Sequence, residues 1–200
     1  MIILIGGAGC AGKTLMAQRL LEKYGFPYLS LDHLKMGLCR SGAACGFTPE
    51  SNDFVISARL WPIVRGIIMT AVENRQNLII EGCYLPPDKI AALGEEYLGS
   101  IISFGLILSR DYVTKNYAAL LAHRCDIELR LHPETRTAEE IADENDRLTT
   151  VYAQTGAKYF TVEKDYRAEL AAVYDWLDGE ISRLRAVTPA PRTPGPKALP

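Results

Sequence analysis

Apolar and polar positions follow two different periods along this chain, and their order predicts an α/β protein. Short apolar runs rich in β-branched residues are typical of buried parallel strands, and they cover 1–6, 26–31, 77–81, 100–108 and 158–162. Between them, apolar residues recur every three or four positions, as in amphipathic helices. Such helices are expected over 14–24, 33–38, 52–74, 87–97, 110–131, 138–155 and 166–185. This alternation predicts a five-stranded parallel sheet with helices on both faces.

Local signals set several element boundaries. Gly25 follows the first predicted helix, where a left-handed residue commonly ends a helix. Thr137 and Glu140 form a capping box that predicts the start of a later helix. Pro62 lacks a backbone donor and lies inside 52–74, so we expect a kink or break there.

The chain of 200 residues suits one domain, which we place at 1–185. Residues 186–200 contain five prolines and no core pattern, so they are predicted to be a disordered Pro-rich tail.

The most specific chemistry lies between the first strand and the first helix. Gly7, Gly12, Lys13 and Thr14 fill every fixed position of the G-x-x-x-x-G-K-[ST] pattern, in the strand–loop–helix context that it requires. Backbone N–H groups of such a loop bind phosphate, the lysine reaches the β/γ-phosphates, and the threonine hydroxyl ligates Mg²⁺. We therefore predict ATP and Mg²⁺ as cofactors. The predicted cofactor-binding residues are Gly7, Ala8, Gly9, Cys10, Ala11, Gly12, Lys13 and Thr14, with Lys13 also catalytic.

The ends of the second and third strands supply further candidates, because ligands of parallel sheets bind at the carboxyl ends of the strands. Asp32 is predicted to take a proton from a substrate hydroxyl, although an aspartate there also caps the next helix. Glu81 is predicted to hold Mg²⁺ through water or to bind the acceptor, since a buried glutamate is rare unless it is paired or functional. Gly82 would let substrate approach the backbone, and an ordinary turn glycine is its alternative interpretation.

Arginines on two helical segments complete the predicted site. Arg59 is a candidate wall of the acceptor pocket or a surface arginine. Residues 110–137 are predicted to form a cationic lid that excludes water, with Arg124 as its catalytic arginine and Arg130 as a second candidate. Acidic residues are interleaved there, so a salt-bridged helical surface competes with this interpretation.

The composition limits the classes of molecule that this chain is expected to bind. A net charge of −2 argues against a nucleic-acid groove but not against a small phosphate site. Five scattered cysteines without a C-x-x-C pair, and no signal peptide, favour reduced thiols in the cytoplasm. No apolar run approaches the ~18 residues of a membrane span, so no membrane partner is expected. The pattern leaves the oligomeric state open.

Three segments resemble the P-loop small-molecule kinases: Gly7 to Thr14, the run Leu29-Ser30-Leu31-Asp32-His33-Leu34-Lys35, and Ile80-Glu81-Gly82. That family includes adenylate kinase-like, shikimate and gluconate kinases, chloramphenicol phosphotransferase and zeta-toxin kinases. The chain looks most like bacterial 2-phosphoglycerate kinase-like proteins, over about residues 1–180. The resemblance implies a P-loop NTPase fold with a helical lid and transfer of the γ-phosphate of ATP to a hydroxyl or phosphate of a small molecule. In relatives with an acidic residue after the second strand, that residue contacts the acceptor hydroxyl, which implies this role for Asp32.

Two alternatives remain beside this function. One is a nucleoside monophosphate kinase, although such enzymes typically carry Asp-Gly-x-Pro-Arg after the third strand, where this chain has Glu81-Gly82-Cys83-Tyr84-Leu85-Pro86. The other is a regulatory module that senses ATP without catalysis. The chain has no Asn-Lys-x-Asp motif, which disfavours a GTPase switch. The identity of the acceptor stays open.

Overall fold

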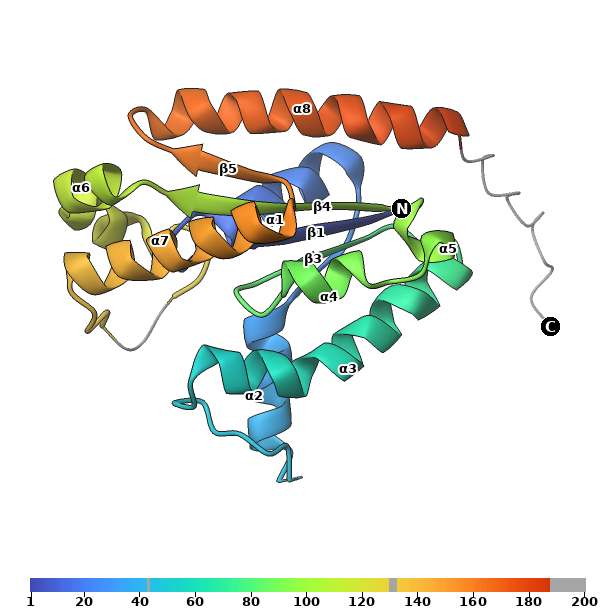
Figure 1. Ribbon diagram of the computed structural model, residues 1–200, viewed down its shortest axis with the longest axis horizontal. Coiled ribbons are helices and arrows are strands. Elements are labelled where there is room, and N and C mark those ends of the chain that lie inside the picture. Colours follow the sequence, from blue (N-terminus) through green and yellow to red (C-terminus); the bar gives the residue numbers. More distant parts are fainter. Residues whose placement is uncertain (43, 130–132, 188–200) are drawn as a thin grey trace.

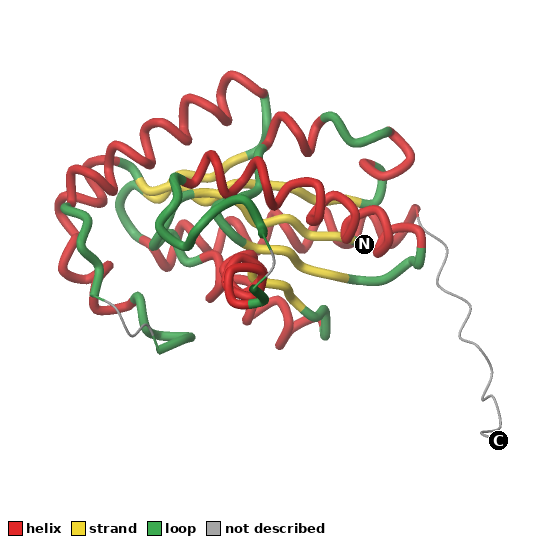
Figure 2. The backbone as a smooth tube through the Cα atoms, turned by 90° about the horizontal axis from the view of Figure 1, so that it is seen from below, coloured by secondary structure: helices red, strands yellow, loops and turns green. Residues whose placement is uncertain are grey.

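A computed structural model describes residues 1–42, 44–129 and 133–187 of the chain. Its strands form one parallel sheet in the order β2-β3-β1-β4-β5. The strands are β1 (Ile2–Gly7), β2 (Tyr28–Ser30), β3 (Leu78–Glu81), β4 (Ile101–Leu108) and β5 (Tyr159–Val162). Figures 1 and 2 show these strands running through the middle of the molecule between layers of helices. The predicted α/β class and five-stranded parallel sheet are confirmed.

The helices connect the strands in the predicted alternating order. They are α1 (Lys13–Tyr24), α2 (Leu31–Arg40), α3 (Asp53–Glu73), α4 (Pro87–Ala91), α5 (Glu95–Leu98), α6 (Arg110–His123), α7 (Ala138–Thr155) and α8 (Tyr166–Val187).

Two apolar clusters cover the two faces of the sheet, and β1 contributes to both because successive strand residues point to opposite faces. Ile3 and Ile5 pack in a cluster with side chains from α1, α6, α7 and α8. Ile2 and Leu4 pack in a second cluster with side chains from α2, α3 and α4. All four isoleucine and leucine side chains are fully buried, so β1 is the centre of the fold. The loop that follows β1 therefore starts from a fixed point.

Three predicted elements differ from the structure. α3 is one continuous helix through Pro62, so the break that was one expected outcome is absent, while a kink there stays a prediction. Leu60, Trp61 and Val64 around Pro62 are buried. Residues 87–97 form two short helices, since the extended backbone of Gly94 separates them. The helix expected over 110–131 ends at His123, and Leu129 beyond it is 83% exposed, so no packing supports further turns.

α3 also bears on the membrane prediction. By length and average apolar composition it is the one helix among the described residues that could cross a bilayer. Its charged residues interrupt any continuous apolar run, and Ile56, Leu60, Val64 and Ile68 are buried against the second cluster. Core packing thus accounts for part of its apolar composition, while Phe54, Val55 and Ile63 on the same helix are exposed. At the other end of the chain, α8 extends to Val187, and the rest of the predicted tail lies outside the described residues.

Candidate active site

The loop after β1 has the backbone of an anion-binding nest. Gly7, Cys10 and Gly12 have positive φ angles of 113°, 60° and 87°. A Cβ atom on Gly7 would lie only 2.0 Å from the carbonyl oxygen of Leu106 in β4, so only glycine fits there. Turning the chain in this way brings successive N–H groups to one concave side at the start of α1, which is the arrangement that binds phosphate.

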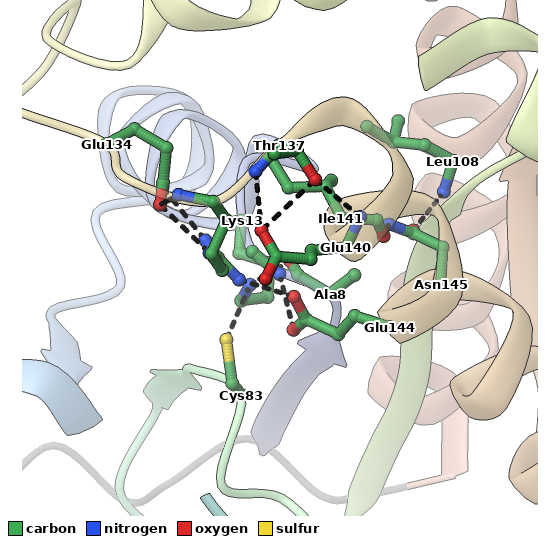
Figure 3. Close-up of polar contacts among 12 residues, drawn as sticks. Ala8, Lys13, Cys83, Leu108, Glu134, Thr137, Glu140, Ile141, Glu144 and Asn145 are labelled. Atoms are coloured by element: carbon green, nitrogen blue, oxygen red, sulfur yellow. Dashed lines mark hydrogen bonds and ion pairs between the residues drawn. The ribbon is translucent and has the colours of Figure 1, made fainter. Parts of the chain in front are cut away.

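Lys13 is the first residue of α1 and is 7% exposed. Its ammonium group donates to the carbonyl oxygen of Ala8 at 2.5 Å and to Sγ of Cys83 at 3.3 Å, as Figure 3 shows. Burial alone would lower the pKa of Lys13, but the Cys83 sulfur and nearby carboxyl groups outweigh burial and raise it. Lys13 is therefore a buried cation with two uncharged partners, Ala8 in the loop and Cys83 after β3.

A cavity of about 640 Å³ opens beside this loop and collects most of the predicted site residues. The second half of the loop lines it, together with the first turn of α2, the end of β3 and the segment after α6. The predicted residues that line it are Cys10, Gly12, Lys13, Thr14, Asp32, Glu81 and Arg124. The loop after β1, the start of α2, the end of β3 and the end of α6 thus meet at one cavity. This agrees with ligand binding at the carboxyl ends of parallel strands.

Glu81 ends β3 and is 2% exposed. It lies beside the hydroxyl groups of Ser30 and Thr14, and burial raises its pKa. Its Oε1 atom has no hydrogen-bond partner within the ranges that the structure describes. A buried polar atom without a partner is costly, so a ligand that pairs with this oxygen would be favoured. A carboxylate next to a threonine hydroxyl provides the hard oxygen donors that Mg²⁺ prefers, so these two residues fit the predicted metal.

Asp32 lies in the first turn of α2, directly after β2, and its side chain is 51% exposed. Nζ of Lys35 lies 3.6 Å from its Oδ1 atom and donates to the hydroxyl of Tyr84 at 3.0 Å. Asp32 therefore keeps open lone pairs on the cavity side while a lysine limits its mobility.

Two residues predicted to bind substrate, Arg59 and Gly82, do not line the cavity. Arg59 in α3 packs instead against the turn at Gly46, where a Cβ atom would lie 3.1 Å from its Nε atom. Gly82 has a φ of 153°, and a Cβ atom there would lie 2.8 Å from Cβ of Leu31. Close packing of β3 against α2 is thus sufficient reason for glycine at position 82. The substrate-binding role of both residues stays a prediction.

Arg136, in the segment before α7, and Glu144 on α7 complete the phosphate side. Sequence reasoning included Arg136 only as one cation of the lid 110–137 and missed Glu144. The guanidinium of Arg136 donates to Oε2 of Glu144 at 2.6 Å and to both carboxylate oxygens of Glu134 at 2.9 Å. It lies over Gly9, where a Cβ atom would be 3.1 Å from Nη2. Glu144 in turn accepts the N–H of Gly9 at 3.2 Å. A carboxylate and an arginine therefore occupy the loop where a phosphate would bind.

α7 presents Glu144 rigidly, because its neighbour Asn145 is fully buried and bonded at both ends. Oδ1 of Asn145 accepts the N–H of Leu108 at 2.7 Å, and its Nδ2 donates to Ile141 at 2.8 Å (Figure 3). The predicted capping box of Thr137 and Glu140 is present at the start of the helix. Sequence could have supplied this signal, since the capping box fixes the phase of α7 and places Glu144 one turn after Glu140.

The predicted lid is only partly helical. Arg110 at the start of α6 binds three carboxylates of α7, those of Glu139, Asp143 and Asp146, so it joins two helices. Within 110–137, the interleaved charges pair as Lys115 with Asp111 and Arg136 with Glu134, which is the salt-bridged surface that the alternative interpretation predicts. Arg124 lines the cavity just after α6, whereas Arg130 lies outside the described residues.

No protein-family model and no curated protein matches the chain. Solved structures share its fold. Shikimate kinase from Acinetobacter baumannii in complex with shikimate aligns with a TM-score of 0.55 at 16% identity, over 91% of this chain and 93% of that one. A sugar kinase from Janibacter aligns with a TM-score of 0.51 at 14% identity, over 88% of this chain and 94% of that one. Deoxyadenosine kinase from M. mycoides with bound dATP aligns with a TM-score of 0.50 at 15% identity, over 89% and 100%. The chain thus has the fold of small-molecule kinases, as the sequence resemblance implies.

Proposed function

We propose that this protein is an ATP-dependent phosphotransferase that moves the γ-phosphate to a hydroxyl of a small-molecule acceptor. One observation carries the proposal. The cavity that holds the phosphate loop and its buried lysine also holds Asp32 and Glu81, which come from two other strand ends. A phosphate donor and an acceptor could therefore meet there.

On the donor side, the loop N–H groups and Lys13 would bind the β- and γ-phosphates. Thr14 and Glu81 would hold Mg²⁺, directly or through water. When bound, Mg²⁺ would supply neutralisation of the phosphate charge. Lys13 needs little rearrangement, because its present acceptors are a backbone carbonyl and a thiol rather than a carboxylate.

On the acceptor side, Asp32 would accept the proton of the acceptor hydroxyl. The hydroxyl oxygen forms a bond to the γ-phosphorus while the bond from that phosphorus to the β–γ bridging oxygen breaks, and ADP leaves with the electron pair. The exposed carboxylate of Asp32 suits this role because it can reach an incoming molecule.

Two arginines would neutralise the transferred group. Arg124 lines the cavity and is the predicted lid arginine. Arg136 lies closer to the loop, over Gly9, and would exchange the carboxylate of Glu144 for a phosphate oxygen. Both guanidinium groups are charge-assisted donors that can bind a phosphate in the bidentate way.

The test is acceptor-dependent formation of ADP from ATP with the wild-type protein and two variants. Asp32→Asn should lower kcat by at least about 100-fold, the scale of general-base catalysis, and leave ATP affinity unchanged. Asp88→Asn, which removes an exposed carboxylate from the first turn of α4, is the matched control and should retain the wild-type rate. An Asp32→Asn rate equal to that of the control would show that Asp32 is not the base.

The contact between Gly9 and Glu144 favours one alternative of another class, an ATP-sensing module without catalysis. Nucleotide binding would break this contact and so reach α7 without any transfer. Such a module would bind ATP in a Lys13-dependent way but form no ADP with any acceptor. A nucleoside monophosphate kinase would instead form ADP with a monophosphate acceptor.

A further inference from the structure

A carboxylate of the protein itself binds the phosphate loop. The backbone N–H of Gly9 donates to Oε1 of Glu144 at 3.2 Å, although the two residues are 135 positions apart. The N–H groups of such a loop are the donors that bind a phosphate. Glu144 therefore uses a hydrogen-bond donor that a polyphosphate would also use.

The second oxygen of this carboxylate binds the arginine nearest to the loop. Nη1 of Arg136 donates to Oε2 of Glu144 at 2.6 Å, and Nη2 of Arg136 lies over Gly9. Both oxygens of Glu134 accept hydrogen bonds from the same guanidinium. A phosphate at Gly9 would need Arg136 as well, so it would have to take two donors from the carboxylate of Glu144.

The cavity shows which part of the loop these side chains cover. The cavity reaches Cys10 but not Gly9, where Arg136 and Glu144 lie instead. The side chain of Glu144 is only 16% exposed, so water screens its charge less than it screens a surface pair. Charge-assisted hydrogen bonds of this kind are about twice as strong as neutral ones.

α7 keeps Glu144 at the loop. The next residue, Asn145, is fully buried, and its Oδ1 atom accepts the N–H of Leu108 in β4 (Figure 3). Moving the helix away would break this buried hydrogen bond, which is costly. We therefore expect the side chain of Glu144, and not the helix, to move when a phosphate binds.

Lys13 differs from Glu144 in what a phosphate must overcome. The two partners of Lys13 are uncharged, and a phosphate oxygen can replace them. Glu144 has the same sign of charge as a phosphate, and like charges in contact oppose binding. The same loop thus contains one group that attracts the polyphosphate and one that it must expel.

We propose that Glu144 competes with the polyphosphate for the loop and thereby lowers the affinity of the protein for ATP. Before ATP binds, the carboxylate holds the Gly9 N–H and Arg136. When ATP binds, phosphate oxygens take both donors and the Glu144 side chain turns away, and it returns when the nucleotide leaves. This inference rests on the proposed binding of ATP at the loop, but it does not depend on transfer to any acceptor.

The test compares wild-type protein with Glu144→Gln by calorimetric titration, using MgATP and, separately, sodium tripolyphosphate without Mg²⁺. The substitution keeps the size of the side chain and removes its charge, so the variant should bind both ligands at least about tenfold more tightly. Asp143→Asn is the matched control, because it removes a carboxylate from the neighbouring position of α7 that pairs with Arg110 instead. It should bind both ligands as the wild type does.

The opposite sign of the change would identify another role for Glu144. Equal or weaker binding of both ligands by Glu144→Gln would overturn the inference and leave the ATP site intact. Weaker binding of MgATP alone would make Glu144 a metal ligand and would also overturn it. No binding by the wild type or either variant would overturn the ATP site and the inference with it.

Thermal unfolding gives a second readout that separates competition from a purely structural role. Without nucleotide, Glu144→Gln should unfold at a lower temperature than the wild type, because its bonds to Gly9 and Arg136 are weaker. The same concentration of MgATP should raise its melting temperature by more than that of the wild type, since a tighter ligand stabilises the folded state more. A smaller rise than in the wild type would contradict the competition.

Discussion

The donor side and the acceptor side of the cavity are built in different ways. On the donor side, glycines set the geometry through contacts that exclude any side chain, as at Gly7, and α1 buries Lys13, Met16, Ala17 and Leu20. On the acceptor side, α2 buries only Leu31, and charged side chains from three elements set the geometry. We infer that the geometry of the donor side is preformed, whereas side chains on the acceptor side rearrange when a molecule binds.

Arg136 gives the largest expected effect in this comparison, because its guanidinium lies over Gly9 in the phosphate loop and would bind the transferred group. Arg136→Gln should lower kcat by about 100-fold, the usual loss when one donor to the transition-state charge is removed. Steady-state kinetics with an acceptor that supports ADP formation measures this. The matched control is Arg183→Gln, since Arg183 also binds a glutamate on the surface but lies far along α8. Equal rates in the two variants would mean that Arg136 only stabilises the loop.

Asn145 tests how rigid the donor side is. Asn145→Ala leaves the buried N–H of Leu108 without its acceptor and should cost about 2 kcal/mol of stability. Urea unfolding of the purified protein measures the difference. Asn74→Ala, at the exposed end of α3, should stay within about 0.5 kcal/mol of the wild type. A loss no larger than that of the control would show that α7 is not anchored by this residue.

Glu81 should show a conflict between stability and activity. Burial raises its pKa, so the folded protein binds this proton more tightly than the unfolded chain, and the ionised carboxylate destabilises the fold as pH rises. Glu81→Gln should therefore be more stable than the wild type by about 1 kcal/mol at pH 7, with the gain shrinking toward pH 4, while turnover falls. Thermal unfolding across this pH range measures the gain. Glu163→Gln, at the exposed end of β5, is the control, and an equal response of both variants would refute the argument.

Glu134 should give the smallest effect. Its hydrogen bonds with Arg136 lower the pKa of Glu134 to about 2, so the pair stabilises the fold above the ordinary carboxyl range and loses this contribution as pH falls toward that value. Glu134→Gln should reduce stability at pH 7 by less than about 1 kcal/mol. The gap between variant and wild type should close as urea unfolding is repeated at lower pH. A gap that widens on acidification would contradict this sign.

The donor side could be predicted from sequence because its determinants are contiguous. Gly7 to Thr14, the apolar strand before it and the helix after it predict the loop, and the strand ends predict where Asp32 and Glu81 meet it. The capping box of Thr137 and Glu140 is predictable for the same reason, since its two residues are three positions apart.

The other features of the site depend on contacts between segments that are distant in the sequence. The pairing of Gly9 with Glu144 joins residues 135 positions apart, and no periodic pattern signals it. Arg59 was a reasonable wall residue by position, but the phase of α3 turns it toward Gly46. Tyr84 and Lys35 meet only because β2 and β3 are neighbours in the sheet.

The central claim is that the loop after β1 binds the polyphosphate of a nucleotide, and calorimetric titration with MgATP tests it most directly. The wild-type protein should release or absorb heat with saturable binding, Lys13→Met should lose at least about 100-fold in affinity, and the exposed Lys115→Met should bind as the wild type does. Saturable binding of equal strength in Lys13→Met, or no binding by the wild type, would contradict the claim.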